Sequence, residues 1–362
     1  MTQQKRKNGQ KQGPGVDRPG LLGAEAYAHQ IVKHLAQVTA LSGYGPAVVF
    51  ADWTQLVHIS LEALPDHLRA IARTGRWAED TPETAEVFAR IRARYTNAYA
   101  SASSPRVWDN FGQAFGLLLE SAAPGLWAYA RFDGGYMGPD VIGRCYMNFA
   151  NADPSWSAQY WTPWNVARMM AQMTIMEGER EVHNRLKAAL THPDNILGAA
   201  VLLAALTIPE DQPQLYPEWF FARIIPAALP YYEPITFCEP AIGSGVMMLA
   251  AASCFPDWAV LMHLVTFSGQ DIDQQAVCLA KINEMLYGLN GYALKLAQAV
   301  GEVMEAQQSA PHPTSLILPK SPQAALEQAV RLHRQQKSAA QDSAPTFEEL
   351  FGATAKVDPI SV

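Results

Sequence analysis

The sequence has no apolar run as long as the roughly 20 residues that span a bilayer. Its longest apolar segment, residues 196–208, is followed by Pro209 and predicts a buried helix. The N-terminal residues are polar and basic, so the chain lacks the apolar start of a secretory signal peptide. These absences predict a cytoplasmic protein without membrane contact.

Cysteine is scarce and scattered. The four copies are Cys145, Cys238, Cys254 and Cys278. None belongs to a Cys-x-x-Cys pair, which argues against a zinc site and predicts buried, reduced thiols. His58, His67 and His263 share no ligand spacing with a cysteine or an acid, and His183 and His192 are predicted at the surface. No metal site is therefore predicted.

Positive charge is also in short supply. Lys and Arg number 27 against 34 Asp and Glu, and the formal net charge of -7 argues against a broad nucleic-acid-binding surface. Two basic clusters remain, one near each end of the chain: Lys5, Arg6, Lys7, Lys11, Arg331, Arg334 and Lys337. DNA contact through them is expected to be weak and salt-sensitive, and solvated tails without a partner are an equal alternative.

Strand-like alternation is scarce in the first part of the chain. Residues 1–20 are rich in Gln, Lys and Gly and predict a disordered basic tail. Apolar residues at three- and four-residue spacing predict a helical domain over 21–150. A second domain is predicted over 151–305, and a polar extension with a helix over 306–362.

The pattern changes after residue 234. The runs ITFCEP, LVTFSGQDID and YALKLAQAVGE are strand-like, and two helix-like runs separate them. This β-α-β-α-β order predicts a parallel sheet with right-handed crossovers. In such sheets, ligands lie beyond the carboxyl ends of the strands.

The first strand-like run leads into the turn EPAIGSG (239–245) and then into an Ala- and Met-rich helix. Gly243 and Gly245 would let a ligand lie against the backbone, and the helix start offers free amide donors. An ordinary tight turn is an equal alternative. Glu239 suits an ammonium or sulfonium ligand better than a pyrophosphate.

An acid ends the second strand-like run. Asp271 lies where a carboxylate accepts both ribose hydroxyls, and Ile272 is placed to pack on an adenine face. Asp273 is predicted as the N-cap of a helix that begins near Gln274. In the alternative interpretation, Asp271 or Asp273 is merely that cap.

These motifs resemble those of the adenine-specific DNA methyltransferases, in particular the modification subunits of type I restriction systems. The run 239–245 is similar to the family's acid-Pro-x-x-Gly-Ser-Gly motif, and Asp271 followed by AKINEMLYG resembles its next motif. Gly301-Glu302 resembles a third motif, with Glu in place of Asp. Upstream, Thr162 stands in an aromatic-Thr-Pro segment like the one that holds the cofactor's methionine carboxylate, with Pro163 expected at the first helical position.

The resemblance covers about residues 140–305 and implies an S-adenosylmethionine site. The residues that it implies as cofactor ligands are Thr162, Glu239, Pro240, Ala241, Gly243, Gly245, Asp271, Ile272 and Glu302. No residue is assigned to catalysis.

The family's catalytic signature is missing. That signature, Asn or Asp followed by Pro-Pro and an aromatic residue, holds a flipped adenine. The run SLILPKSP (315–322) lies where it is expected and lacks it. The expected fold is therefore α/β, with an N-terminal helical domain followed by a truncated Rossmann-like domain that has only the cofactor half of the sheet. Such a sheet would have an exposed edge strand. We expect this edge to be covered by a protein partner, by a second copy of the chain, or by helices of the same chain, among them one at 322–338.

Three functions stay open at this point. In the first, the chain is a methyltransferase subunit whose catalytic motif comes from a partner chain. In the second, it is an inactive methyltransferase-like module that acts in interaction or regulation within a defence or mobile-element system. In the third, it is a helical interaction protein that has lost the cofactor. Whether it is an enzyme is left open, and methyl transfer by the chain alone is not expected.

Overall fold

The computed structural model describes residues 24–97, 104–127, 140–150, 162–206 and 215–309. Residues Leu22–Val303 form one compact unit, which contains both described strands and all the described helices except the end of the last. The predicted basic tail, the run SLILPKSP and the predicted helix at 322–338 lie outside the described residues, as do both basic clusters.

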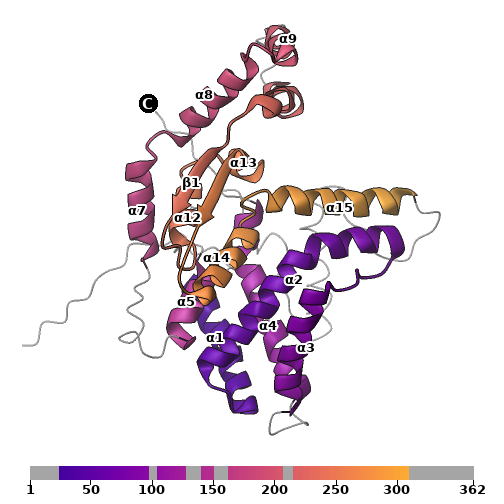
Figure 1. Ribbon diagram of the computed structural model, residues 1–362, viewed down its shortest axis with the longest axis vertical. Helices are drawn as coiled ribbons and strands as arrows, with labels where there is room; N and C mark the ends of the chain where they lie inside the picture. Colours follow the sequence, from indigo (N-terminus) through magenta and orange to yellow (C-terminus); the bar gives the residue numbers. More distant parts are fainter. Residues whose placement is uncertain (1–23, 98–103, 128–139, 151–161, 207–214, 310–362) are drawn as a thin grey trace, which may run out of the picture. The chain divides into compact units, whose positions relative to one another are not determined.

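The described part of residues 24–150 is helical, as predicted (Figure 1). Its elements are α1 (Ala24–Ser42), α2 (Pro46–Thr74), α3 (Pro82–Asn97), α4 (Ser104–Trp127), α5 (Val141–Cys145) and the π-helix η3 (Tyr146–Ala150). Helix α2 has a proline at its first position and ends at Gly75, whose φ of 69° is left-handed, as helix ends favour. Helix α1 packs against α4 through buried residues at helical spacing, among them Ile31 and Leu35.

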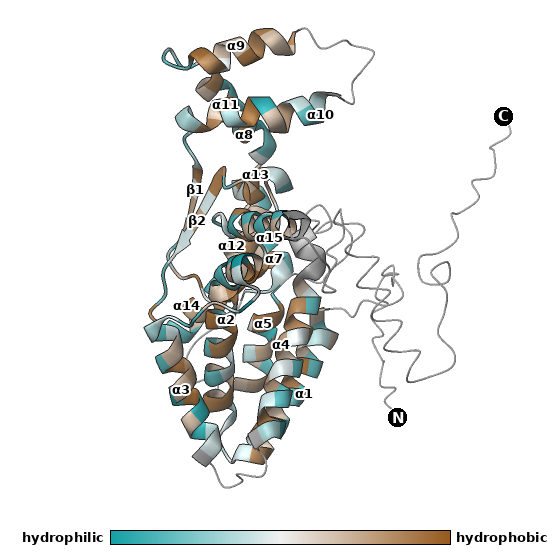
Figure 2. Ribbon diagram, turned by 90° about the vertical axis from the view of Figure 1, so that its right-hand side faces the viewer, coloured by the Kyte–Doolittle hydropathy of each residue, from teal (hydrophilic) through white to brown (hydrophobic). Residues whose placement is uncertain are grey.

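A second series of short helices precedes the sheet. Its elements are α7 (Trp164–Thr174), α8 (Gly178–Leu190), α9 (Ile196–Ala205), α10 (Leu215–Trp219), η4 (Phe220–Ile224), α11 (Ile225–Ala228) and η5 (Leu229–Tyr231). The prediction of a buried helix at 196–208 is wrong. In α9 only Gly198 is buried, and Ile196 is 83% exposed, although the helix is apolar on all sides (Figure 2).

Strands β1 (Ile235–Glu239) and β2 (Val265–Gly269) pair in parallel, with Phe237 opposite Phe267. The connection between them contains α12 (Val246–Ala252) and α13 (Asp257–Leu261), and α14 (Gln274–Leu286) follows β2. The chain is therefore mostly helical with a small parallel sheet, which is compatible with the α/β class predicted.

The prediction of a third strand is wrong. The run YALKLAQAVGE begins α15 (Tyr292–Ser309), so the sheet has two strands within the described residues. Most residues of α15 are good helix formers such as Ala, Leu, Lys, Gln and Glu, and a short apolar run alone does not distinguish a strand from a helix. Gly288 and Gly291, with φ of 68° and 80°, turn the chain between α14 and α15.

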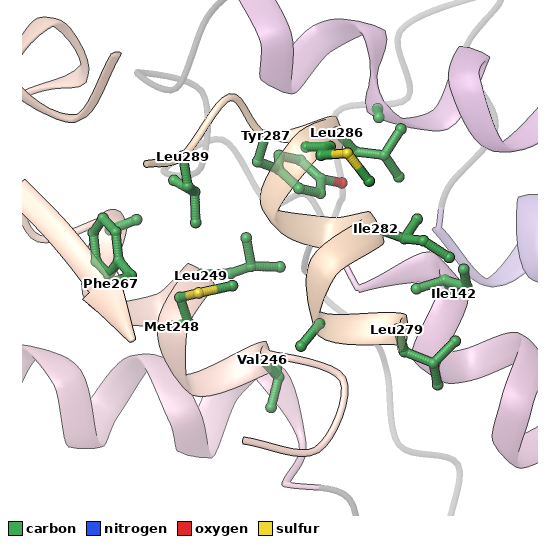
Figure 3. Packing of buried hydrophobic residues seen from close by; sticks show 14 of the residues in the cluster. Ile142, Val246, Met248, Leu249, Phe267, Leu279, Ile282, Leu286, Tyr287 and Leu289 are labelled. Atoms are coloured by element: carbon green, nitrogen blue, oxygen red, sulfur yellow. The ribbon is translucent and has the colours of Figure 1, made fainter. Parts of the chain in front are cut away.

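Helices α12 and α14 pack together beside the sheet (Figure 3). The buried side chains labelled there include Met248 and Leu249 of α12 and Ile282 and Leu286 of α14. Helix α14 also packs on α2, where the Gln275 side-chain amide donates to the Thr54 hydroxyl at 2.9 Å. Residues of the predicted domains 21–150 and 151–305 thus share one core.

In the described part of the chain, no helix has the length and apolar character needed to cross a membrane. All four cysteines are free thiols, but the prediction that they are buried holds only for Cys145, because Cys238 is exposed and the other two are half-buried.

Candidate functional site

The turn after β1 is held by backbone bonds to the segment after β2. Gln270 N–H donates to Glu239 O at 3.1 Å, and Ile242 N–H donates to Gln270 O at 2.9 Å. Gly243 and Gly245 have φ of 53° and 87°, values that favour glycine. The turn therefore depends on its two glycines, and it lies at the carboxyl edge of the sheet.

Asp271 joins the glycine turn to the end of β2. Its Oδ2 accepts the Gly243 N–H at 2.9 Å, and its Oδ1 accepts the Asp273 N–H at 3.0 Å. Asp273 caps α14 by accepting the Gln275 N–H at 2.9 Å, so the prediction of Asp273 as the cap is confirmed. Asp271 is left with lone pairs that a ribose could use, because an ionised carboxylate has about four acceptor positions.

The residues beside Asp271 and Gly243 leave room for a ligand. The Ile272 side chain is 106% exposed, so nothing among the described residues covers this apolar group. Pro240 and Ala241 are exposed as well. The Glu239 carboxylate accepts the Ala241 N–H at 3.1 Å through one oxygen. These are the positions predicted around the adenosine and sulfonium parts of the cofactor.

The half-buried residue Asp140 bonds to the turn as well, and the prediction of site residues missed it. It accepts the Ser244 hydroxyl at 2.5 Å, the Asn283 side-chain amide at 2.8 Å and the Gly143 N–H at 3.0 Å. Asn283 also donates to Ser244 O at 2.8 Å. One network therefore fixes the turn to α5 and α14.

Burial raises the pKa of the Asp140 carboxyl above its ordinary value, because the charged form loses its water. The three donated hydrogen bonds and Arg144 oppose that rise. The sequence contains one signal for this network: Asn283 lies on the apolar side of a helix, where a buried amide needs partners.

A cavity of about 360 Å³ adjoins this network. It is lined by Glu25, Asp140, Gly143, Arg144, Met147, Asn148, Thr162, Pro163, Trp164, Asn165 and Val246. Its volume lies within the range of small-molecule sites, about 300–1,000 Å³. Arg144 donates to Glu25 at 2.9 Å across its wall.

Thr162 lies in this cavity, just before α7. The prediction of Pro163 at the first helical position is one residue off, because Pro163 is the N-cap residue and Trp164 begins the helix. The Thr162 hydroxyl makes no hydrogen bond within the described part of the chain. It therefore has its full hydrogen-bonding capacity available to a ligand.

Glu302 lies apart from the other predicted site residues. It belongs to α15 and not to a strand end, and its carboxylate accepts hydrogen bonds from Arg69 Nε at 3.3 Å and Arg73 Nη2 at 2.8 Å, both on α2. The structure thus brings the turn (239–245) and Asp271 together, places Thr162 at the neighbouring cavity, and gives Glu302 a role in packing α15 against α2.

Metal ligation is not indicated in the residues that the structure describes, since no three His, Cys, Asp or Glu side chains gather there to hold an ion. The surface positions predicted for His183 and His192 are confirmed.

Comparisons with models of known families, with curated proteins and with solved structures find no match.

Proposed function

We propose that the chain binds S-adenosylmethionine at the carboxyl edge of the sheet. The observation that carries this proposal is the 2.9 Å hydrogen bond from Gly243 N–H to Asp271 Oδ2. It holds a carboxylate that keeps free acceptor positions against a glycine turn, which supports a ribose-binding role for Asp271.

The residues present offer a partner for each part of such a ligand. Asp271 would accept the ribose hydroxyls, and the exposed Ile272 would pack on the adenine. The Thr162 hydroxyl would hold the methionine carboxylate in the 360 Å³ cavity. Glu239, with one oxygen not used by Ala241, would face the positive charge of the ligand. When bound, S-adenosylmethionine supplies an electrophilic methyl group.

Titration calorimetry with S-adenosylmethionine and S-adenosylhomocysteine tests the proposal. Asp271→Asn should weaken binding about 10-fold or more, because hydrogen bonds to a charged group contribute about 1.5–3 kcal/mol. Asp273→Asn is the matched control: asparagine caps helices as well as aspartate does, so affinity should not change. Equal binding by both variants would reject the ribose assignment, and no binding by the wild type would reject the pocket.

A second pair of ligands separates the two ends of the site. Thr162→Val should weaken binding of S-adenosylhomocysteine but not of adenosine, which has no methionine carboxylate. Asp271→Asn should weaken both. Loss of adenosine binding in Thr162→Val would contradict the placement of the methionine end in the cavity.

A second candidate function is an interaction module that binds the cofactor without transferring its methyl group. Helix α7, which begins at the cavity, exposes Met169, Met170 and Met173, and the exposed Met176 follows the end of the helix. Methionine-rich surfaces adapt to varied partners. Contact with DNA through the chain ends stays a prediction, since the basic clusters lie outside the described residues.

A further inference from the structure

The two edges of the small sheet differ in their free backbone groups. In a parallel ladder, alternate residues of each strand bond to the neighbour. Ile235 N–H donates to Leu264 O, and Gln270 N–H donates to Glu239 O. Residues 235, 237 and 239 therefore face β2, whereas Thr236 and Cys238 direct their N–H and C=O groups away from it.

The outer edge of β2 is closed by a side chain. Phe267 N–H donates to Asn290 Oδ1 at 2.8 Å, and Asn290 Nδ2 donates to Phe267 O at 2.8 Å. The amide of Asn290 thus occupies the position that a peptide group of a third strand would take. A further strand cannot pair with Phe267 while these two bonds are in place.

The outer edge of β1 is open. Thr236 and Cys238 are both exposed, and their backbone groups have no hydrogen-bond partner among the described residues. The strand carries no Lys and no bulge, the features that commonly protect an edge; Pro234 and Pro240 only limit its length. An open edge of this kind is recognised by an extended strand, which supplies complementary donors and acceptors.

We propose that β1 pairs antiparallel with β1 of a second copy of this chain, about a twofold axis at Phe237. In this register, Thr236 forms a hydrogen-bonded pair with Cys238 of the other copy, and Glu239 lies opposite Ile235. The register is self-complementary, because the outward backbone groups meet each other and no like charges face across the axis.

The side chains of β1 favour the same register. Phe237 is half-buried and lies 6.2 Å from the Phe267 ring, centroid to centroid. Pairing would place Phe237 opposite its own copy and extend the two rings into a row of four. Directly opposed aromatic side chains stabilise antiparallel strand pairs. The proposal does not depend on cofactor binding, since it uses only the edge of β1.

Cysteine cross-linking of the full chain tests the register. The Cα atoms of a hydrogen-bonded antiparallel pair are about 5.5 Å apart, within the range that a disulfide bridges. Under mild oxidation, Thr236→Cys should therefore form a covalent dimer through Cys238 of the other copy. Cys238 and its own copy are diagonal neighbours about 7–8 Å apart, so the wild type should cross-link at least 10-fold less.

The double variant Thr236→Cys/Cys238→Ser is the matched control and should lose the cross-link. Light scattering after size exclusion should give twice the chain mass for the wild type, and circular dichroism should confirm that each variant is folded. A folded, monomeric Thr236→Cys variant without cross-link would overturn the proposal and leave the edge to a different chain. Equal cross-linking in the double variant, or efficient cross-linking of the wild type, would overturn this register.

Discussion

At the scale of single residues, the candidate site rests on polar groups that hydrogen-bond one another, two of which, Ser244 and Asn283, are buried. Asp140, Ser244 and Asn283 satisfy one another across α5, the glycine turn and α14. A buried group that loses its partner costs more than the hydrogen bond itself contributes. The stability of the turn is therefore expected to depend on each member of the network.

Replacing the amide of Asn283 should destabilise the protein. Asn283→Ala leaves Asp140 Oδ1 and Ser244 O each without one donor, which should lower the free energy of unfolding by about 1–3 kcal/mol. Urea denaturation measures this. Asn184→Ala is the control: Asn184 is exposed on α8, so its replacement should change stability by less than about 0.5 kcal/mol. Similar losses in both variants would contradict the network.

The raised pKa of Asp140 makes stability depend on pH. A carboxyl with a raised folded-state pKa binds its proton more tightly in the folded chain, so it favours folding at low pH. This contribution is lost as pH rises from about 4, the ordinary pKa of Asp, through the raised value. The wild type should therefore lose stability relative to Asp140→Asn as pH rises above about 4.

Parallel urea titrations of the two proteins at several pH values measure that difference. Because the other titrating groups are common to both chains, their effects cancel. A difference that stays constant over the range would show that Asp140 is not shifted.

The position of Gly245 should be intolerant of a side chain. A Cβ there would stand 3.1 Å from Met248 Cε and 3.4 Å from Ala280 Cα, at a φ of 87°. Gly245→Ala should therefore cost about 1–2 kcal/mol for the left-handed backbone and more for the crowding. Gly43 has a φ of 76° and open space around it, so Gly43→Ala should show only the cost of the left-handed backbone, measured by thermal or urea unfolding. An equal loss of stability in the two variants would mean that the turn at Gly245 relaxes to accommodate the added methyl group.

At the scale of elements, α15 replaces an expected strand and brings its own contacts. Glu302 bridges to Arg69 and Arg73 of α2, and the Tyr292 hydroxyl donates to Leu61 O at 2.5 Å. Together with Asn290, which closes the edge of β2, these contacts end the sheet at two strands within the described residues.

Glu302→Gln separates this packing role from a role in the cofactor site. The ion pairs are partly exposed, so the free energy of unfolding should fall by less than about 1 kcal/mol. Calorimetry should show wild-type affinity for S-adenosylhomocysteine, in contrast to Asp271→Asn. A loss of affinity as large as that of Asp271→Asn would return Glu302 to the ligand site.

At the scale of the whole molecule, the described part of the chain joins a candidate ligand site to a sheet of two strands. The 362 residues contain no Asn or Asp followed by Pro-Pro and an aromatic residue. Helix α9 and the methionines of α7 are exposed in the described part of the chain, and large exposed apolar patches commonly mark surfaces for association.

The purified chain alone should therefore not methylate adenine in duplex DNA. It has no known group to hold a flipped base, although the proposed site would supply the methyl donor. Transfer of a labelled methyl group from S-adenosylmethionine to DNA measures this, and an adenine methyltransferase assayed in parallel is the positive control. Incorporation of label by this chain, abolished in Asp271→Asn, would contradict the expectation and demand another base-holding site.

The sequence by itself determined the features that depend on neighbouring residues. The Asp273 cap, the glycine turn and the helices of residues 24–150 all follow from interactions between residues a few positions apart, which a local pattern records. The position of Asp271 beside the turn was also readable, because parallel strands end at one edge.

Only the tertiary structure decided what depends on distant contacts. Asp140 meets Ser244 and Asn283 across 104 and 143 positions of the chain, and no local pattern encodes such a meeting. The apolar residues after Gly291 do not by themselves distinguish a strand from a helix; in the structure the run forms α15, and its Glu302 pairs with Arg69 and Arg73 of α2. Helix α9 is largely exposed although its composition predicts burial, because burial requires an opposing surface. In the described part of the chain that surface buries Gly198 and covers Val201 and Leu202 only in part.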